Sequence, residues 1–252
     1  MKKYTIVTVL AFLSLTACKE QTEKPKENRA LDAESPSKPA SGTEEAWIVL
    51  FDGTSMDAWK GYRMEEVPPS WAIEDGALVF TPPAKPAGEN HNLVTRENFG
   101  DFVLSLEWKI SEGGNSGIFW GVQEEPHYSQ PYQTGPEIQV LDDARHPDAA
   151  NGTTHQAGAL YDMVPPAASV VKPAGEWNLC EITVDYGKER GSVRLNGTEI
   201  VTFPLGNEAW DAMVAKSKFN GWKGFGENPV GRIGLQDHGD PVAFRNIKIK
   251  PL

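Results

Sequence analysis

The chain has 252 residues, with 24 Lys and Arg against 35 Asp and Glu, so its formal net charge is −11. Proteins that bind nucleic acid need a basic patch to neutralise phosphates, and no basic stripe occurs here, so we expect no nucleic-acid partner. Two cysteines, at positions 18 and 180, leave no intramolecular disulfide if the first is modified.

The N-terminus has the pattern of a secretion signal. Two lysines precede an apolar run over residues 6–13, which is too short to span a bilayer as a mature helix. Leu-Thr-Ala then leads into Cys18, which resembles a bacterial lipobox, where the cysteine is acylated and becomes the first mature residue. We therefore predict a lipoprotein signal peptide over residues 1–17 and lipidation of Cys18. The alternative is an ordinary signal peptide with an incidental cysteine.

Residues 18–46 comprise the predicted lipidated cysteine and a linker rich in Glu, Lys, Pro and Ser. Such a composition buries too little apolar surface to fold, so this segment is expected to be a disordered tether to the membrane. Lys19 stands where many Gram-negative lipoproteins retained in the inner membrane have Asp. We expect a lipid-anchored protein of the bacterial cell envelope, attached to the outer membrane and facing either the periplasm or the exterior.

Residues 47–252 have the pattern of one β-rich domain. The clearest strand is Phe102–Ile110, where Phe, Leu and Trp alternate with Ser, Glu and Lys. Asn196-Gly197 predicts a tight hairpin turn, and only Glu208–Lys218 has helical spacing. With 24 Gly and 19 Pro, this pattern predicts an all-β jelly-roll sandwich of two antiparallel sheets with one short helix. The other predicted strands are Trp47–Phe51, Ala77–Thr81, Gly117–Val122, Glu137–Leu141, Asn178–Asp185, Ser192–Leu195, Glu199–Phe203, Arg232–Gln236 and Ala243–Ile249.

The strand at Glu137 combines core residues with ionisable chemistry. Ile138 and Val140 are expected to face the core, while Glu137 and Gln139 face the other way. With Asp142, this segment resembles the Glu-x-Asp-x-x-Glu signature of a retaining β-glucanase family, whose two carboxyl groups must lie about 5–5.5 Å apart. Here Gln replaces the middle acid and the shorter Asp the last one, so the segment predicts the location of a site better than its reaction.

Further candidates surround this strand. Asp142 and Asp143 either cap turns or bind a metal ion. His155 lies in a Gly- and Thr-rich loop, and His238 ends a predicted strand that also carries Gln236. The remaining candidates for substrate binding are Asn115 and the aromatic residues Trp120, Tyr161 and Trp222, although most aromatic residues in a sandwich belong to the core.

A second resemblance covers most of the chain, from about Trp47 to Leu252. The chain resembles the 3-keto-disaccharide hydrolase family, which implies a concanavalin-like jelly roll acting on glycosides whose sugar carries a 3-ketone. One departure is Trp120, where many members have Arg. The motifs that carry the resemblance are, in order, Asn115-Ser-Gly-Ile-Phe119, Glu137-Ile-Gln-Val-Leu-Asp142, Gly158-Ala-Leu-Tyr-Asp162, Lys172-Pro-Ala-Gly-Glu-Trp-Asn178, Leu195-Asn-Gly197, Gly234-Leu-Gln-Asp-His-Gly239 and Phe244-Arg-Asn-Ile247.

This substrate class suggests a mechanism. A 3-ketone acidifies the proton on C2, so a base can remove it, the C1 substituent can leave by β-elimination, and water can add back. Glu137 is the candidate base. His155, His238 and Gln236 are candidates to polarise the ketone, a task that a divalent metal ion could also perform. No fixed-spacing ligand motif such as HExxH accompanies them.

Two other functions remain open on the sequence alone. The same fold could be a non-catalytic carbohydrate-binding module, for which a base at Glu137 would be dispensable. It could also be a glucanase-like glycoside hydrolase acting on unoxidised sugar.

Overall fold

The computed structural model describes residues 46–84 and 90–252. The predicted signal peptide, the lipidation site at Cys18 and almost all of the predicted tether lie outside the described residues. Within the described part, no helix is both long enough and apolar enough to cross a membrane.

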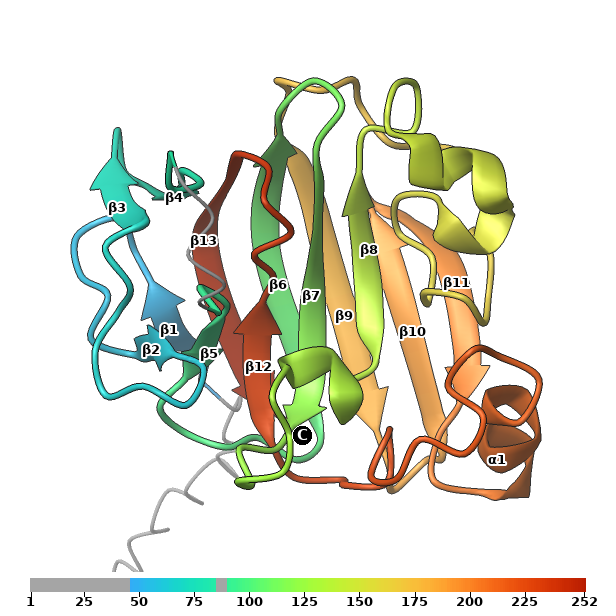
Figure 1. Ribbon diagram of the computed structural model, residues 1–252. Helices are drawn as coiled ribbons and strands as arrows, with labels where there is room; N and C mark the ends of the chain where they lie inside the picture. Colours follow the sequence, from blue (N-terminus) through green and yellow to red (C-terminus); the bar gives the residue numbers. More distant parts are fainter. Residues whose placement is uncertain (1–45, 85–89) are drawn as a thin grey trace, which may run out of the picture. The chain divides into compact units, whose positions relative to one another are not determined.

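Two antiparallel sheets stack face to face, with the smaller sheet in front in Figure 1. The larger sheet has the order β11-β10-β9-β6-β13-β4-β3, and β1 also pairs with β13. The smaller sheet has the order β2-β5-β12-β7-β8. The strands are β1 Ile48–Phe51, β2 Trp59–Gly61, β3 Trp71–Glu74, β4 Ala77–Phe80, β5 Leu93–Thr95, β6 Phe102–Ile110, β7 Asn115–Val122, β8 Glu137–Leu141, β9 Asn178–Asp185, β10 Arg190–Leu195, β11 Thr198–Pro204, β12 Arg232–Leu235 and β13 Val242–Pro251.

The core lies between the two sheets because each sheet turns one apolar face inward. On β6, Leu104, Leu106 and Trp108 are buried in this core. They share it with Ile138 and Val140 of β8 in the opposite sheet. This arrangement confirms the predicted all-β, jelly-roll sandwich of two antiparallel sheets.

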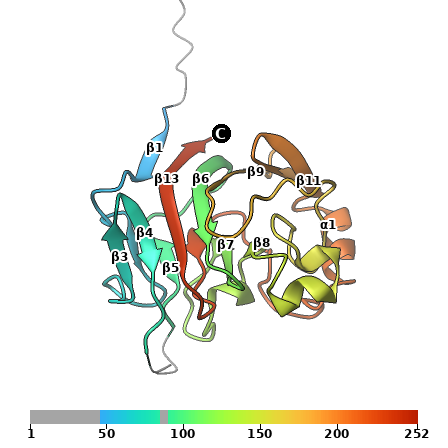
Figure 2. The same ribbon diagram turned by 90° about the horizontal axis from the view of Figure 1, so that it is seen from above.

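The connections agree with local sequence signals. Asn196 and Gly197 both have positive φ, 50° and 85°, as the predicted turn between β10 and β11 requires. The described residues contain one α-helix, α1 (Glu208–Val214), and Asn207 caps it by accepting from two backbone N–H groups. Three 3₁₀ turns lie at Pro131–Gln133, Pro147–Asn151 and Thr153–His155. Figure 2 shows the last two, in yellow, beside β8.

Three strands and one helix end differ from the sequence prediction. The strands β2, β3 and β5 were not predicted, because three or four residues are too few to show alternation. The helix ends at Val214 instead of Lys218. The segment that follows the helix carries Lys218 and Trp222, and both residues line the site described next.

Candidate functional site

The site begins on the outer face of the smaller sheet, where β7 and β8 pair. Glu137 lies opposite Phe119, and Gln139 lies opposite Gly117. Because the alternating residues Ile138 and Val140 belong to the core, the two polar side chains emerge on the other face. Gly117 makes room for the acid, because a Cβ at this position would lie 2.0 Å from Glu137 Oε1. The glycine in β7 is therefore what allows a carboxylate to lie flat on the sheet.

A cavity of about 370 Å³ opens above these strands. Seven residues predicted from the sequence line it together: Asn115, Glu137, Gln139, Tyr161, Trp222, Gln236 and His238. Three that were not predicted as site residues complete the lining: Tyr132, Lys218 and Phe219.

Glu137 has an unusual environment for a carboxylic acid. Only 7% of its surface is exposed, and this burial raises its pKa to about 8. The charge of Lys218 and a hydrogen bond from Gln236 lower the pKa in part, whereas the charge of Asp148 raises it further. A carboxylate with a raised pKa is a stronger base than an exposed one, which suits it to remove a weakly acidic proton.

Three amide side chains surround Glu137, and all are buried: Asn115, Gln139 and Gln236. Within the described residues, the side-chain oxygen of each of the three has no hydrogen-bond partner. A buried polar atom without a partner costs free energy, and native structures leave few of them. Three such acceptors at one cavity fit a ligand that donates several hydrogen bonds, as the hydroxyl groups of a sugar do.

Asp148 holds one wall of this cavity in place. Its Oδ2 accepts from the Tyr161 hydroxyl at 3.0 Å and from Gln139 Nε2 at 3.3 Å. Its Oδ1 lies 3.0 Å from His155 Nδ1 and accepts from Asn151 at 2.8 Å. Burial alone would raise the pKa of Asp148, but these hydrogen bonds hold it below its usual value.

His155, a predicted catalytic residue, does not line the cavity. Its Nδ1 faces Asp148, and its Nε2 lies 3.1 Å from Asp162 Oδ1. The other oxygen of Asp162 accepts from the backbone N–H of Lys218 at 2.6 Å. His155 thus links the wall at Asp148 to the segment that presents Lys218.

Lys218 is the most informative residue that the sequence prediction missed. Its Nζ lies 4.0 Å from the centre of the Tyr161 ring, a cation–π contact at the cavity wall. The helical spacing in the sequence extends over this lysine and so predicts it as part of the helix. Only the helix end at Val214 and the hydrogen bond to Asp162 bring it to Glu137.

Three other predicted residues lie outside the cavity. Trp120 points into the core, 2% exposed, and stacks on Phe203 with ring centroids 5.6 Å apart. Asp142 accepts from the backbone N–H groups of Gly113 and Ala144, and Asp143 from that of Ala157. The carboxylates of Asp142 and Asp143 therefore cap turns here.

His238 has unexpected neighbours at one end of the cavity. Its Nε2 lies 3.5 Å from Asn115 Nδ2, and its ring is 6.0 Å from that of His146. Desolvation lowers the pKa of His238, against the opposing effect of the Asp240 charge, and the nearby His146 lowers it further, although the residue is exposed to solvent. With Asp240, these histidines form a group whose ligand atoms lie within 4.8 Å of one another.

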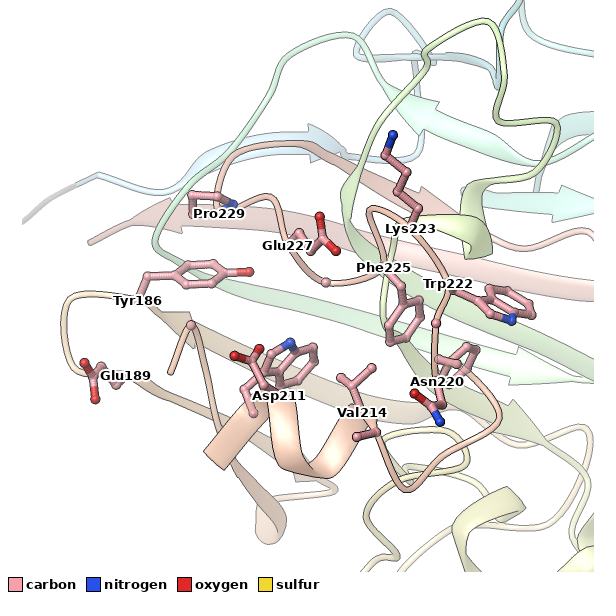
Figure 3. Close-up of a pocket in the computed structure, with 16 residues that line it drawn as sticks. Tyr186, Glu189, Asp211, Val214, Asn220, Trp222, Lys223, Phe225, Glu227 and Pro229 are labelled. Atoms are coloured by element: carbon pink, nitrogen blue, oxygen red, sulfur yellow. The ribbon is translucent and has the colours of Figure 1, made fainter. Parts of the chain in front are cut away.

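A larger cavity, of about 720 Å³, lies on the other side of the segment that carries Phe219 and Trp222. Figure 3 shows Asp211 and Val214 of α1 facing Phe225 across it. Its carboxylates, at Glu189, Asp211 and Glu227, are all exposed to solvent. Because buried polar groups distinguish the smaller cavity, we assign the chemistry there despite its smaller volume.

Comparisons with known proteins agree with this fold and show the family. Residues 46–250 match the model of a family described as a 3-keto-alpha-glucoside-1,2-lyase-like domain. A 3-keto-disaccharide hydrolase of Bacteroides thetaiotaomicron is 37% identical over 231 residues, which cover 82% of this chain and 79% of that protein. This chain belongs to the 3-keto-disaccharide hydrolase family.

Solved structures of similar sequence have the same fold. A protein of Parabacteroides distasonis ATCC 8503, described as a candidate glycosyl hydrolase, is 32% identical with a TM-score of 0.76. The match covers 82% of this chain and 95% of that one. A second such protein of the same organism is 26% identical with a TM-score of 0.60, over 82% of this chain and 100% of that one. The resemblance predicted from the sequence motifs is thereby confirmed, and the family is one of hydrolases with a carbohydrate substrate.

Proposed function

We propose that this protein cleaves the glycosidic bond of 3-keto-glycosides or 3-keto-disaccharides, with Glu137 as the base. The observation that carries the proposal is a buried carboxyl group of raised pKa, surrounded by three buried amides whose oxygens lack partners among the described residues. The amides suit sugar hydroxyl groups, and the acid suits removal of a carbon-bound proton.

The reaction follows from the acidity that a ketone confers on its neighbour. Glu137 takes the proton from C2, and the electron pair moves into the enolate of the C3 ketone. The enolate then expels the C1 oxygen, which takes up the proton held by Glu137, and a C1–C2 double bond conjugated to the ketone forms. Glu137 then removes a proton from water as the water oxygen adds to C1 and delivers that proton to C2, so the net change is hydrolysis.

The negative charge that develops on the ketone oxygen needs a positive or hydrogen-bonding partner. The Lys218 ammonium group lies in the cavity wall and already acts on the charge of Glu137. The side chains of Gln236 and His238 are further donors in the same cavity. Groups fixed in advance around the developing charge stabilise the transition state more than mobile water does.

Elimination followed by hydration also accounts for both names attached to the relatives. The family description names a lyase, whereas the Bacteroides relative is named a hydrolase. Elimination is the reaction of a lyase, and elimination followed by hydration amounts to hydrolysis.

The test is incubation of wild type and Glu137→Gln with a 3-keto-disaccharide in deuterium oxide. Wild type should release both sugars and exchange deuterium into C2, and the variant should lose about 10³-fold in rate, within the range that acid–base catalysis contributes. Glu125→Gln, an exposed acid outside the cavity, is the matched control.

Full cleavage by Glu137→Gln would exclude Glu137 as the base. Binding without cleavage by wild type would indicate a carbohydrate-binding module, and cleavage of unoxidised β-glucan a glucanase-like hydrolase.

We also propose that the protein works at the bacterial cell envelope, anchored by a lipid on Cys18 and held off the outer membrane by residues 19–46. The support is the lipobox-like sequence and the linker composition. Mass spectrometry of the purified protein should detect a diacylglyceryl group on Cys18, and Cys18→Ser should move the protein from the membrane to the soluble fraction. Membrane attachment of Cys18→Ser would contradict the anchor.

A further inference from the structure

His146, His238 and Asp240 form a cluster at the end of the cavity, and of these three residues the proposed acid–base chemistry uses only His238. One nitrogen or oxygen atom from each lies within 4.8 Å of the others. His146 follows β8, whereas His238 and Asp240 come from the connection between β12 and β13, more than 90 residues later. The two imidazole rings meet edge-on, at 81°.

Asn115 adds a fourth polar group to this cluster. It is 4% exposed, its Nδ2 lies 3.5 Å from His238 Nε2, and its Oδ1 has no hydrogen-bond partner in the part of the chain that the structure describes. Asp240 uses Oδ2 to accept from the backbone N–H of Asn115 at 3.1 Å. A buried amide oxygen with no partner, next to two imidazoles and a carboxylate, is a set of donor atoms that suits a cation.

We propose that His146, His238 and Asp240 bind one divalent transition-metal ion, with Asn115 beside it. Two imidazoles and one carboxylate suit ions such as Zn²⁺, Mn²⁺, Fe²⁺ or Co²⁺, and three protein ligands leave positions open for substrate or water. Because His238 and Asn115 also line the cavity, the ion lies where it can meet the oxygen atoms of a bound sugar.

The function of the ion rests on the proposed reaction, whereas its binding does not. A ketone with a neighbouring hydroxyl group offers two oxygen atoms that can chelate one metal ion. A metal ion at a ketone oxygen acts as a Lewis acid and stabilises the enolate. The substrate class would then be sugars whose oxidised carbon lies next to a free hydroxyl group.

Metal binding has to replace one existing hydrogen bond. His146 Nδ1 accepts from the backbone N–H of Asp148 at 3.1 Å, and an amide N–H can only donate. In the metal-free chain, a neutral His146 therefore carries its proton on Nε2. The ion must displace this bond or turn the ring, so we expect the amide resonance of Asp148 to shift when metal binds.

The experiment measures Co²⁺ binding by the metal-stripped, full-length protein, using calorimetry and the visible absorption of the bound ion. Wild type should bind one equivalent. We expect His146→Ala, His238→Ala and Asp240→Asn each to weaken binding at least tenfold, with circular dichroism confirming that they fold. His127→Ala is the matched control, because this exposed histidine also pairs with a carboxylate, Glu125, at 3.7 Å.

Two outcomes would overturn the metal site: no saturable Co²⁺ binding by wild type, or unchanged absorption in the double variant of His146 and His238. Glu137→Gln separates this proposal from the proposed function, because it should bind Co²⁺ like wild type while losing cleavage. If wild type cleaves a 3-keto-disaccharide at full rate without binding Co²⁺, only the metal site fails. If it binds Co²⁺ but cleaves no 3-keto sugar, only the proposed function fails.

Discussion

At Glu137, burial suits the proposed chemistry, because it makes the deprotonated form a stronger base. The same burial means that, without substrate, the carboxyl group is mostly protonated at neutral pH. Neighbouring charges then influence the fraction of Glu137 that is deprotonated, and the charge of Lys218 increases this fraction.

The first prediction concerns the pH dependence of activity. Because only the carboxylate accepts a proton, catalytic efficiency should rise about tenfold per pH unit below pH 7 and level off near pH 8. Lys218→Met removes the charge that lowers the pKa of Glu137, so its profile should shift to higher pH. Lys223→Met, a lysine outside the cavity, should leave the profile in place. A flat profile between pH 6 and 8 would contradict the role of Glu137.

At the scale of elements, the strand pair β7–β8 and the turns after β8 build the site together. The strands supply a rigid floor, with Gly117 as the gap beneath Glu137. The turns supply a wall, tied through Asp148, His155 and Asp162 to the segment after α1.

The second prediction tests the floor. Gly117→Ala places a methyl group where the Glu137 carboxyl lies, so we expect catalytic efficiency to drop by about 10²-fold or more, with a destabilisation of about 1–3 kcal/mol from overpacking. Gly100→Ala is a suitable control, because a Cβ there has no neighbour nearer than 3.5 Å and no positive φ is required. Equal activity of the two variants would show that the acid does not depend on this gap.

The third prediction tests the wall. His155→Ala removes the imidazole ring that links Asp148 to Asp162, so the segment with Lys218 should loosen. We expect catalytic efficiency to fall by about 10- to 100-fold, less than for Glu137→Gln, as for a residue that positions others. In a double-mutant cycle, His155→Ala and Lys218→Met should be non-additive. Additive losses would mean that His155 does not act through Lys218.

At the scale of the whole molecule, burying the Glu137 carboxyl group lowers the stability of the folded protein at the pH values where this group ionises. The folded state holds the Glu137 proton up to about pH 8, whereas the unfolded chain releases it near the ordinary value of 4.5. The contribution of Glu137 to the stability of the folded state is therefore fully present below pH 4.5, falls as the pH rises from 4.5 to about 8, and changes little above that.

The fourth prediction follows from this linkage. Glu137→Gln has no proton to lose, so at pH 8 it should be more stable than wild type by on the order of 3–5 kcal/mol, and at pH 4.5 the difference should nearly vanish. Denaturant unfolding of both proteins at both pH values measures this difference. A difference in stability that does not depend on pH would contradict a raised pKa of the buried Glu137 carboxyl group.

The sequence by itself determined the features that depend on local periodicity. Alternation over Phe102–Ile110 and Glu137–Leu141 gave the strands and the face on which Glu137 lies, because side chains in a strand alternate whatever surrounds them. The turn at Asn196-Gly197 followed from the positive φ that both positions require. The ordered motifs were sufficient to indicate the family.

Only the tertiary structure decided which side chains meet. Trp120 faces the core, and Lys218 reaches the cavity because the helix ends four residues early. His146 and His238 become neighbours although more than 90 residues separate them. Such contacts depend on sheet register and on the path of long connections, which no local pattern specifies, so the sequence located the acid and the structure assembled its surroundings.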